Sequence, residues 1–205
     1  MPYSPEHKLE TRRRIVEHAR ILFNQQGFSE VSIDQIMAGV GLTRGGFYNH
    51  FRNKDELYAE AVASFLNGRG SSWREEAGID PVNGGPDTVR AMIDSYLSPE
   101  HLDDIEGQCP MIALPSDVAR ATPEVRAAYL ALLRAMTFLF EHNLAGGPRD
   151  TRRDALALSA LCVGGMVLAR TIDDSDLADE LREACRRFAR AFADLEDQPR
   201  NSKPS

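Results

Sequence analysis

The side chains that could carry covalent or metal chemistry are few and widely separated along the 205-residue chain. They are three cysteines, five histidines and two pairs of acids: Cys109, Cys162, Cys185, His7, His18, His50, His101, His142, Asp103-Asp104 and Asp173-Asp174. The cysteines form no CxxC pair, and the histidines lack the short spacing of metal ligands. The sequence also has no nucleophile motif and no phosphate-binding glycine loop. We therefore expect neither an enzyme nor a metal or cofactor site, and the cysteine usage fits a reducing cytoplasm.

Cys109 has one feature that favours reactivity. It precedes Pro110, and proline is favoured at the first position of a helix. A thiol at a helix N-terminus has a lowered pKa, which makes Cys109 a candidate redox or electrophile sensor. The alternative is a small buried apolar side chain, and we expect Cys162 and Cys185 to have only that packing role.

Recognition of nucleic acid is the chemistry that residues 31–57 indicate, and they read VSIDQIMAGVGLTRGGFYNHFRNKDEL. Ser32 and Thr43 are helix-capping residues, each placed before apolar residues at helical spacing. Gly41 is suited to the positive φ that often ends a helix. The stretch therefore predicts helices over about 33–40 and 44–51 joined by a tight turn. This is the helix-turn-helix pattern, whose second helix enters the major groove of DNA.

The charge distribution agrees with that prediction. Residues 1–54 carry eight Lys and Arg against five acids, whereas residues 55–205 carry sixteen against 26, and the whole chain has a net charge of −7. A basic head on an acidic body is typical of a nucleic-acid-binding protein. The alternative is an acidic cytosolic protein with a locally basic helix.

Apolar periodicity elsewhere predicts an all-α protein of about nine helices and no strand. Besides the pair above, the helices cover about 7–25, 54–66, 87–97, 122–143, 151–170 and 175–195, with one from residue 110 that kinks or splits at Pro115. Residues 67–86 predict a mobile loop with a helical turn near Trp73. We expect a DNA-binding head at 7–53, a ligand-binding and dimerisation body at 54–205, and a disordered tail at 197–205.

The head has a small predicted core, which consists of Ile15, Leu22, Phe23, Ile36, Val40, Leu42, Phe47 and Phe51. So little buried apolar area is marginal for stability, so the head should lean on the helix that follows it. Residues 155–169 are apolar, but they are shorter than the roughly 20 residues that span a bilayer. We expect a core helix there, and with the last helix it should form half of an intermolecular four-helix bundle. The predicted dimer interface is Leu161, Gly164, Gly165, Leu168, Leu181, Phe188 and Phe192.

Over about residues 11–65 the chain resembles one-component bacterial repressors of the TetR family. The resemblance rests on ARILFNQQGF at the end of the first helix and on the string from Val31 through Gly-Val-Gly-Leu-Thr and Phe-Tyr-Asn-His-Phe to Lys54. Met37 and Val40 depart from it, since the family more often has alanine there. Gly46 beside Gly45 also predicts a reading helix that orders fully only on DNA.

The resemblance implies a role for each matching position. Arg44, Gly45 and Asn49 would face the bases with Thr43 at their edge, while Tyr48, His50, Lys54 and the amides near Ser32 would hold phosphates. Arg12, Arg13 and Arg14 would reach the DNA backbone or minor groove, or would form a solvated basic face. The resemblance also implies a homodimer on a palindromic operator, released when a small molecule binds the body.

The effector pocket is expected among the helices of the body. Its candidate residues are Phe65, Met92, Tyr96, Cys109, Met111, Leu114, Tyr129, Met136, Phe138 and Phe140, and most of them would otherwise be ordinary core. Two other functions stay open: a DNA-binding protein that needs no ligand, and a small helical enzyme. The sequence does not separate repressor from activator.

Overall fold

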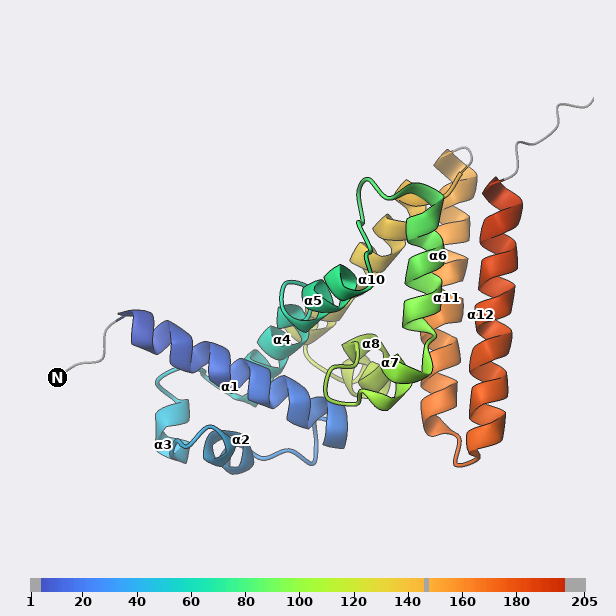
Figure 1. Ribbon diagram of the computed structural model, residues 1–205. Coiled ribbons are helices and arrows are strands. Elements are labelled where there is room, and N and C mark those ends of the chain that lie inside the picture. The colour runs from blue at the N-terminus through green and yellow to red at the C-terminus, as the bar shows by residue number, and fades with distance from the viewer. Residues whose placement is uncertain (1–4, 146–147, 198–205) are drawn as a thin grey trace, which may run out of the picture. The chain divides into compact units, whose positions relative to one another are not determined.

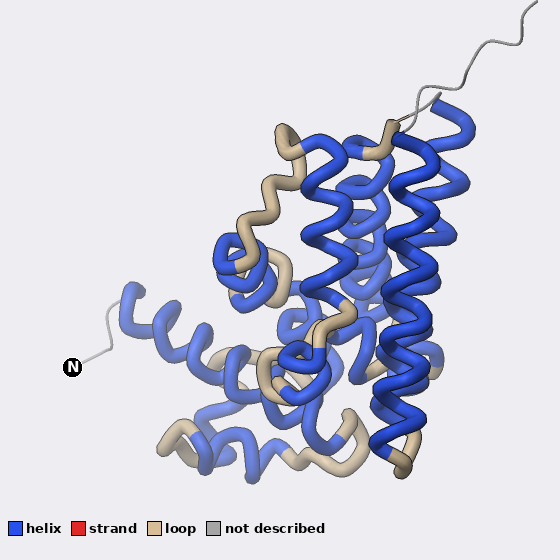
Figure 2. The backbone as a smooth tube through the Cα atoms, turned by 45° about the vertical axis from the view of Figure 1, so that its right-hand side comes forward, coloured by secondary structure: helices blue, strands red, loops and turns tan. Residues whose placement is uncertain are grey.

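The computed structural model describes residues 5–145 and 148–197, and in these residues every regular element is a helix (Figure 2). The helices are α1 (Pro5–Gln26), α2 (Ile33–Gly39), α3 (Arg44–Phe47), α4 (Lys54–Ser64), α5 (Arg69–Glu76), α6 (Gly85–Tyr96), α7 (Pro99–Asp103), α8 (Pro110–Ala113), α9 (Pro115–Ala119), α10 (Pro123–Asn143), α11 (Pro148–Thr171) and α12 (Ser175–Asp197). The all-α prediction is confirmed. The predicted disordered tail lies outside the described residues apart from Asp197.

Three differences raise the number of helices within the described residues from the expected nine to twelve. The helical turn expected near Trp73 within residues 67–86 is the short helix α5, and α7 lies where no helix was expected. The helix predicted from residue 110 is split at Pro115 into α8 and α9, as the proline suggested. Both α5 and α7 are too short and too polar to show an apolar period.

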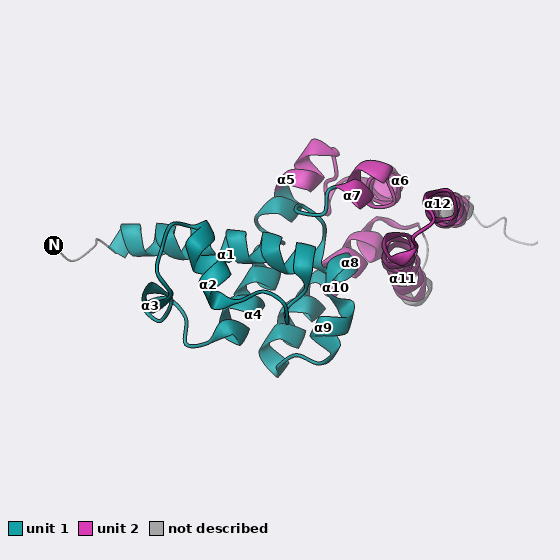
Figure 3. Cartoon of the chain, turned by 90° about the horizontal axis from the view of Figure 1, so that it is seen from below, with its two compact units in different colours: residues 1–71, 104–132 teal, residues 72–103, 133–205 magenta. Residues whose placement is uncertain are grey.

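The chain forms two compact units, which Figure 3 colours separately. The first comprises the described residues of Met1–Ser71 with Asp104–Leu132, and the second comprises Ser72–Asp103 with the described residues of Leu133–Ser205. The helix α10 runs unbroken from one unit into the other, since Leu132 and Leu133 are consecutive within it. These structural units divide the chain differently from the head and body that the sequence predicts.

The first unit has an aromatic centre. Three aromatic rings meet there: Phe23 of α1, Phe28 just after α1, and Tyr58 of α4. Their ring centroids are 4.6 to 5.8 Å apart, and the Tyr58 ring stacks on that of Phe28. Leu57 and Ala61 of α4 are also buried, so α1 does pack on α4 as expected (Figure 1). Burial raises the pKa of the Tyr58 hydroxyl.

The segment around residues 104–117 is tied to the C-terminal half of α1. Buried Arg20 donates to the carbonyl of Glu106 at 2.6 Å, and buried Asn24 donates to that of Gln108 at 2.8 Å. The carboxylate of Asp117 accepts a hydrogen bond from the amide of Phe28 at 2.9 Å. Satisfied polar groups inside a protein are what make such a junction specific. The helix-turn-helix segment thus shares its compact unit with α8 and α9.

The second unit is built on α11 and α12, which run antiparallel, with α6 packed against α12 (Figures 1 and 2). Arg182 of α12, which is buried, donates to the carbonyl of Leu97 at 2.6 Å. Asp94 of α6 binds Arg186 at 3.0 Å and also Arg190. These contacts fix which side of α12 faces its own chain.

One stretch, Thr151–Thr171 in α11, is long and apolar enough to cross a membrane by length and hydropathy alone. It is the only such stretch found within the described residues, and 44% of its most apolar window is buried inside the chain. Core helices of soluble proteins pass the same test, so this is weak support for a span.

Candidate DNA interface

One side-chain cap and one glycine shape the helix-turn-helix; Thr43 is the N-cap residue of α3 by position, but its side chain makes no capping hydrogen bond. The hydroxyl of Ser32 accepts from the amide of Gln35 at 3.1 Å, which caps α2. Gly41 has φ +74°, a conformation that other residues rarely adopt, and the amide of Leu42 then returns to the carbonyl of Met37 at 2.9 Å. Met37 and Phe47 are fully buried and hold α2 against α3.

The reading helix is shorter than predicted. The α-helix covers Arg44–Phe47, and residues 48–50 form turns, whereas the sequence predicted a helix through residue 51. The amides of Asn49 and His50 bond to carbonyls three residues earlier, as in a 3₁₀ turn. Gly45 and Gly46 explain the difference, because each glycine costs roughly 1 kcal/mol relative to alanine within a helix.

Two members of the predicted head core were assigned wrongly. Val40 is half-buried and Leu42 is 36% exposed, so Leu42 does not plug the core. The other six predicted core residues are buried. The turn after Gly41 directs the Leu42 side chain outward. Helical periodicity does not predict this direction, because residue 42 lies beyond the end of the helix.

The predicted base-facing residues lie together on the exposed side of this segment. Thr43, Arg44, Gly45 and Asn49 are all exposed, as is Ser32 at the start of α2. Arg44 forms an ion pair with Asp34, with its Nη1 2.5 Å from Oδ2. Both side chains are more than half exposed, and exposed ion pairs of this kind contribute little to stability. Arg44 could therefore exchange its contact with Asp34 for a contact with the edge of a guanine at little cost in free energy.

The predicted phosphate contacts differ in how available they are. Tyr48 is 57% exposed, while its ring packs edge-on against Phe47. Lys54 is half-buried; its ammonium donates to the carbonyl of Phe28 and lies 4.2 Å from the centroid of the Phe28 ring. Burial lowers the pKa of Lys54. One of the three ammonium donors is used inside the chain, which leaves two for a phosphate.

His50 lies at the edge of a groove of about 570 Å³ between α1 and the reading turn. The groove is lined by His7, Lys8, Thr11, Leu42, Thr43, Gly46, Asn49 and His50. The Nδ1 atom of His50 is buried and has no hydrogen-bond partner among the described residues. Burial, with the nearby charges of Lys8 and Arg12, lowers the pKa of His50. The imidazole is therefore neutral at pH 7 in the absence of DNA.

Sequence reasoning missed the contribution of α1 to this groove. Lys8 and Thr11 stand three residues apart and follow the spacing that leads to buried Ile15, so they share one face of α1. That spacing was visible in the sequence, but nothing there related it to residues 43–50.

The three consecutive arginines of α1 have separate surroundings. Arg13 is exposed, Arg14 donates to the carbonyl of Val40 at 3.1 Å, and Arg12 is engaged with α4 and the end of the reading turn. A common role for all three at the DNA backbone is therefore not favoured.

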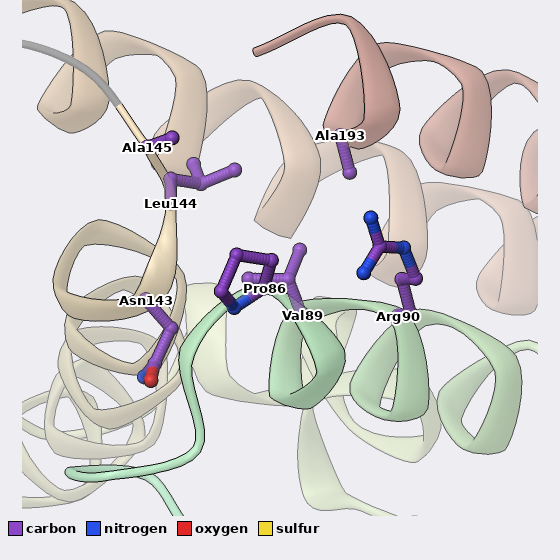
Figure 4. Close-up of a pocket in the computed structure, with 7 residues that line it drawn as sticks. All are labelled: Pro86, Val89, Arg90, Asn143, Leu144, Ala145 and Ala193. Atoms are coloured by element: carbon purple, nitrogen blue, oxygen red, sulfur yellow. The ribbon is translucent and has the colours of Figure 1, made fainter. Parts of the chain in front are cut away.

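The candidate pocket residues divide between the two units. Phe65, Cys109, Met111, Leu114 and Tyr129 belong to the first unit, and Met92, Tyr96, Met136, Phe138 and Phe140 belong to the second. All are buried except Tyr129, which is partly buried, and Phe138, which is 50% exposed and stacks on His142. A shallow hollow in the second unit (Figure 4) has no volume for a water-sized sphere and is lined by none of these residues.

Cys109 is the N-cap residue of α8, as its position before Pro110 predicted, but its side chain is only 3% exposed. A reagent in solution does not reach a thiol buried to that extent, so the packing role is favoured over the sensor role. Tyr129, whose hydroxyl donates to the carbonyl of Met111 at 3.2 Å, has its pKa raised to about 12 by burial and by Cys109.

The predicted dimer residues lie on α11 and α12 with an unusual distribution of sizes. The inward side of α12 carries the small residues Ala178, Ala189 and Ala193, which are buried. Its large apolar residues point away: Leu177 is 48% and Phe188 is 67% exposed, and Leu181 and Phe192 are partly exposed. On α11, Leu156 and Leu168 are also about half exposed.

Comparison with known proteins gives a family for the head and a fold for the rest. Residues 15–61 match the model of bacterial regulatory proteins of the tetR family. The HTH-type transcriptional regulator SrpR of Pseudomonas putida is 35% identical over 91 residues, which are 44% of this chain and 42% of that protein. The matched stretch thus spans less than half the length of this relative.

Solved structures resemble the chain over most of its length. The reduced form of Escherichia coli NemR has a TM-score of 0.71 at 18% identity, covering 88% of this chain and 95% of that one. A transcriptional regulator of the TetR family from Agrobacterium tumefaciens has a TM-score of 0.65 at 21% identity, covering 88% and 98%. Likeness at this level of identity establishes the fold.

Proposed function

Because this chain is a TetR-family protein, with the DNA-binding head of that family on its fold, we propose that it is a homodimeric transcriptional repressor released from a palindromic operator by a small molecule. It would act on double-stranded DNA in the cytoplasm, without a cofactor. The observation that carries the proposal is the exposed group of Arg44, Asn49 and Tyr48 on a segment whose Met37 and Phe47 are fully buried. A rigid base with exposed, base-reading side chains is what direct readout of a major groove requires.

Dimerisation is supported by the outward apolar side of α11 and α12. Large apolar side chains that stay exposed while alanines are buried indicate a surface that is covered in the assembled protein. A second copy fits best, because two antiparallel helices from each copy complete a four-helix bundle. Two heads would then meet successive major grooves, about 34–36 Å apart in the simplest geometry.

An electrophoretic shift with the DNA next to the gene tests the DNA-binding part. The wild-type protein should retard this DNA at low salt, and Arg44→Ala should lose the specific complex because it removes a bidentate guanine contact. Arg120→Ala is the matched control, since it removes another exposed, ion-paired arginine, at the end of α9. No retardation by the wild-type protein at low salt would refute the function.

Release by an effector needs its own test. A compound that binds the folded dimer raises its melting temperature in proportion to occupancy, so a thermal screen identifies candidates. A true effector must also weaken the DNA complex, because ligand and DNA prefer different states of one dimer. If every stabilising compound leaves the electrophoretic shift of the DNA unchanged, the result would favour a DNA-binding protein that needs no ligand.

A further inference from the structure

Arg12 of α1 contacts the end of the reading turn from one side. Its Nη1 atom donates to the carbonyl of His50, and its guanidinium carbon lies 4.0 Å from the centroid of the Phe51 ring. His50 and Phe51 are 38 and 39 positions further along the chain, so this is a tertiary contact. Carbonyls near the end of a helical turn lack partners within the turn, and Arg12 supplies one.

The same guanidinium binds α4 on its other side. Its Nε atom lies 3.1 Å from both carboxylate oxygens of Glu60, and its Nη2 atom binds Glu60 and lies 3.4 Å from Glu56. Glu56 in turn accepts hydrogen bonds from the amide of Arg52 at 2.8 Å and from its Nε at 2.9 Å. One side chain therefore connects α1, residues 50–51 and the first two turns of α4.

Buried Phe51, which packs on Phe47, holds the C-terminal end of the reading turn within the head, and Arg12 links that end to α4. The turn contains two adjacent glycines, one of them with open space around the position of a Cβ, and its α-helical part is four residues long. A planar guanidinium with five donors in a fixed arrangement holds a carbonyl and two carboxylates in one defined geometry, whereas an ammonium is a point charge with three rotatable donors. Arg12 is also only 27% exposed, and its donors are directed into the protein.

We propose that Arg12 is a positioning residue for DNA recognition: it touches no DNA, but it fixes the reading turn to α4 so that Asn49 and Arg44 meet the bases in one register. The proposal rests on the proposed DNA-binding function. It differs from a phosphate-contacting role in a measurable way, because a positioning residue contributes to sequence preference and leaves the number of phosphate contacts unchanged.

The decisive measurement is the affinity for operator and for unrelated DNA of equal length, each over a range of salt concentrations. Arg12→Gln should lower operator affinity by about tenfold or more, as expected for the loss of charged hydrogen bonds. The affinity for unrelated DNA should stay unchanged, as should the slope of log affinity against log salt concentration (the salt slope). Arg12→Lys should restore only part of the preference for operator over unrelated DNA. Arg13→Gln, one position along and exposed, is the matched control, and it should leave the operator preference intact.

Two results would overturn the proposal. Equal losses on both DNAs with a salt slope reduced by about 0.9 would make Arg12 a phosphate contact. Unchanged operator affinity in Arg12→Gln would remove it from recognition altogether.

Two further readouts keep the test decisive. If Arg12→Gln does not fold, Glu60→Gln takes its place, since it weakens the same link from α4 and should lower the operator preference with an unchanged salt slope. Hydrogen exchange in the free protein should show faster exchange of the amides of Asn49, His50 and Phe51 in Arg12→Gln than in Arg13→Gln. That readout needs no DNA, so failure of the wild-type protein to bind DNA would refute the proposed function alone, whereas equal exchange rates would refute the role of Arg12.

Discussion

Gly165 of α11 lies so close to Cys185 of α12 that a Cβ on the glycine would stand 2.9 Å from the sulfur. The preceding glycine differs, because a Cβ on Gly164 would meet no atom of the chain within 4 Å. The two adjacent glycines therefore have different reasons to be small: Gly165 allows α11 and α12 to pack within one chain, and Gly164 lies on the outward side. The sequence suggested a single reason for both.

Substitution of each glycine by alanine should separate these roles. In Gly164→Ala the helix gains up to about 1 kcal/mol of intrinsic propensity without an in-chain clash. In Gly165→Ala the same gain is offset by an overpacking cost of about 1–3 kcal/mol against Cys185. The melting temperature of Gly165→Ala should thus lie several degrees below that of Gly164→Ala, measured by circular dichroism at one protein concentration. Adding Cys185→Ala should recover much of the difference, and failure to do so would mean that the sulfur is not the obstacle.

Phe188→Asp should convert the protein to a monomer. The side chain is 67% exposed in the single chain, so the substitution removes little packing within one protomer, whereas it puts a charge into the proposed bundle. Sedimentation velocity should show the halved mass, with the helix content of the wild type. Glu180→Ala, an exposed change on the same helix, should remain dimeric. A dimeric Phe188→Asp variant would place the contact between copies elsewhere.

Asn49→Ala should relax base preference more than it lowers general affinity. Asparagine pairs with adenine through two hydrogen bonds, which are worth about 1–3 kcal/mol of discrimination. Competition among operators that differ at single positions should reveal one position where the variant no longer distinguishes bases. Tyr48→Phe is the comparison, since loss of a phosphate hydrogen bond should weaken all operators alike. A uniform loss in Asn49→Ala would make Asn49 a phosphate contact.

DNA binding should take up a proton at His50. In the free protein its pKa is lowered below the ordinary 6.5, mainly by burial, with Lys8 and Arg12 adding to the effect, so the imidazole is neutral at pH 7. A phosphate beside the ring would favour the charged form and raise the pKa in the complex. Affinity should therefore increase as the pH falls from 7.5 towards 6, and His50→Gln should flatten that dependence. An unchanged pH profile in the variant would exclude a phosphate contact at His50.

The same shift has the opposite effect on folding. A histidine whose folded pKa is depressed binds fewer protons than in the unfolded chain, so its stabilising effect is complete above pH 6.5 and declines as the pH falls below that value. The melting temperature of the wild type should drop more steeply below pH 6.5 than that of His50→Gln. Together, the two profiles distinguish a change in DNA contact from a change in stability.

Local signals predicted much of this architecture. The cap at Ser32, the split at Pro115 and the long periodic helices all lie where the residues indicate. These features depend on neighbours within a few positions, so a sequence contains them directly. The exposed group around Arg44 and Asn49 was expected only from the family resemblance, and both residues are exposed.

Features that depend on distant partners were not predictable in this way. The Arg12–Arg14 run reads as one basic patch, yet Arg12 is bound to Glu60, 48 positions away. On α12 the pattern identified the apolar stripe of Leu181 and Phe188, but it did not indicate that Ala178, Ala189 and Ala193 form the contact within the chain. The hydrogen bond from Asn24 to the Gln108 carbonyl, 84 positions away, likewise leaves no periodic trace in the sequence.

If the outward apolar residues of α12 join two copies as proposed, the number of protein molecules in a cell becomes part of the regulation. If only the paired form holds two heads, its concentration rises with the square of the monomer concentration when monomers predominate. Operator occupancy would then change more steeply than protein synthesis does. A modest fall in expression would relieve repression by a larger factor, even when no effector is present.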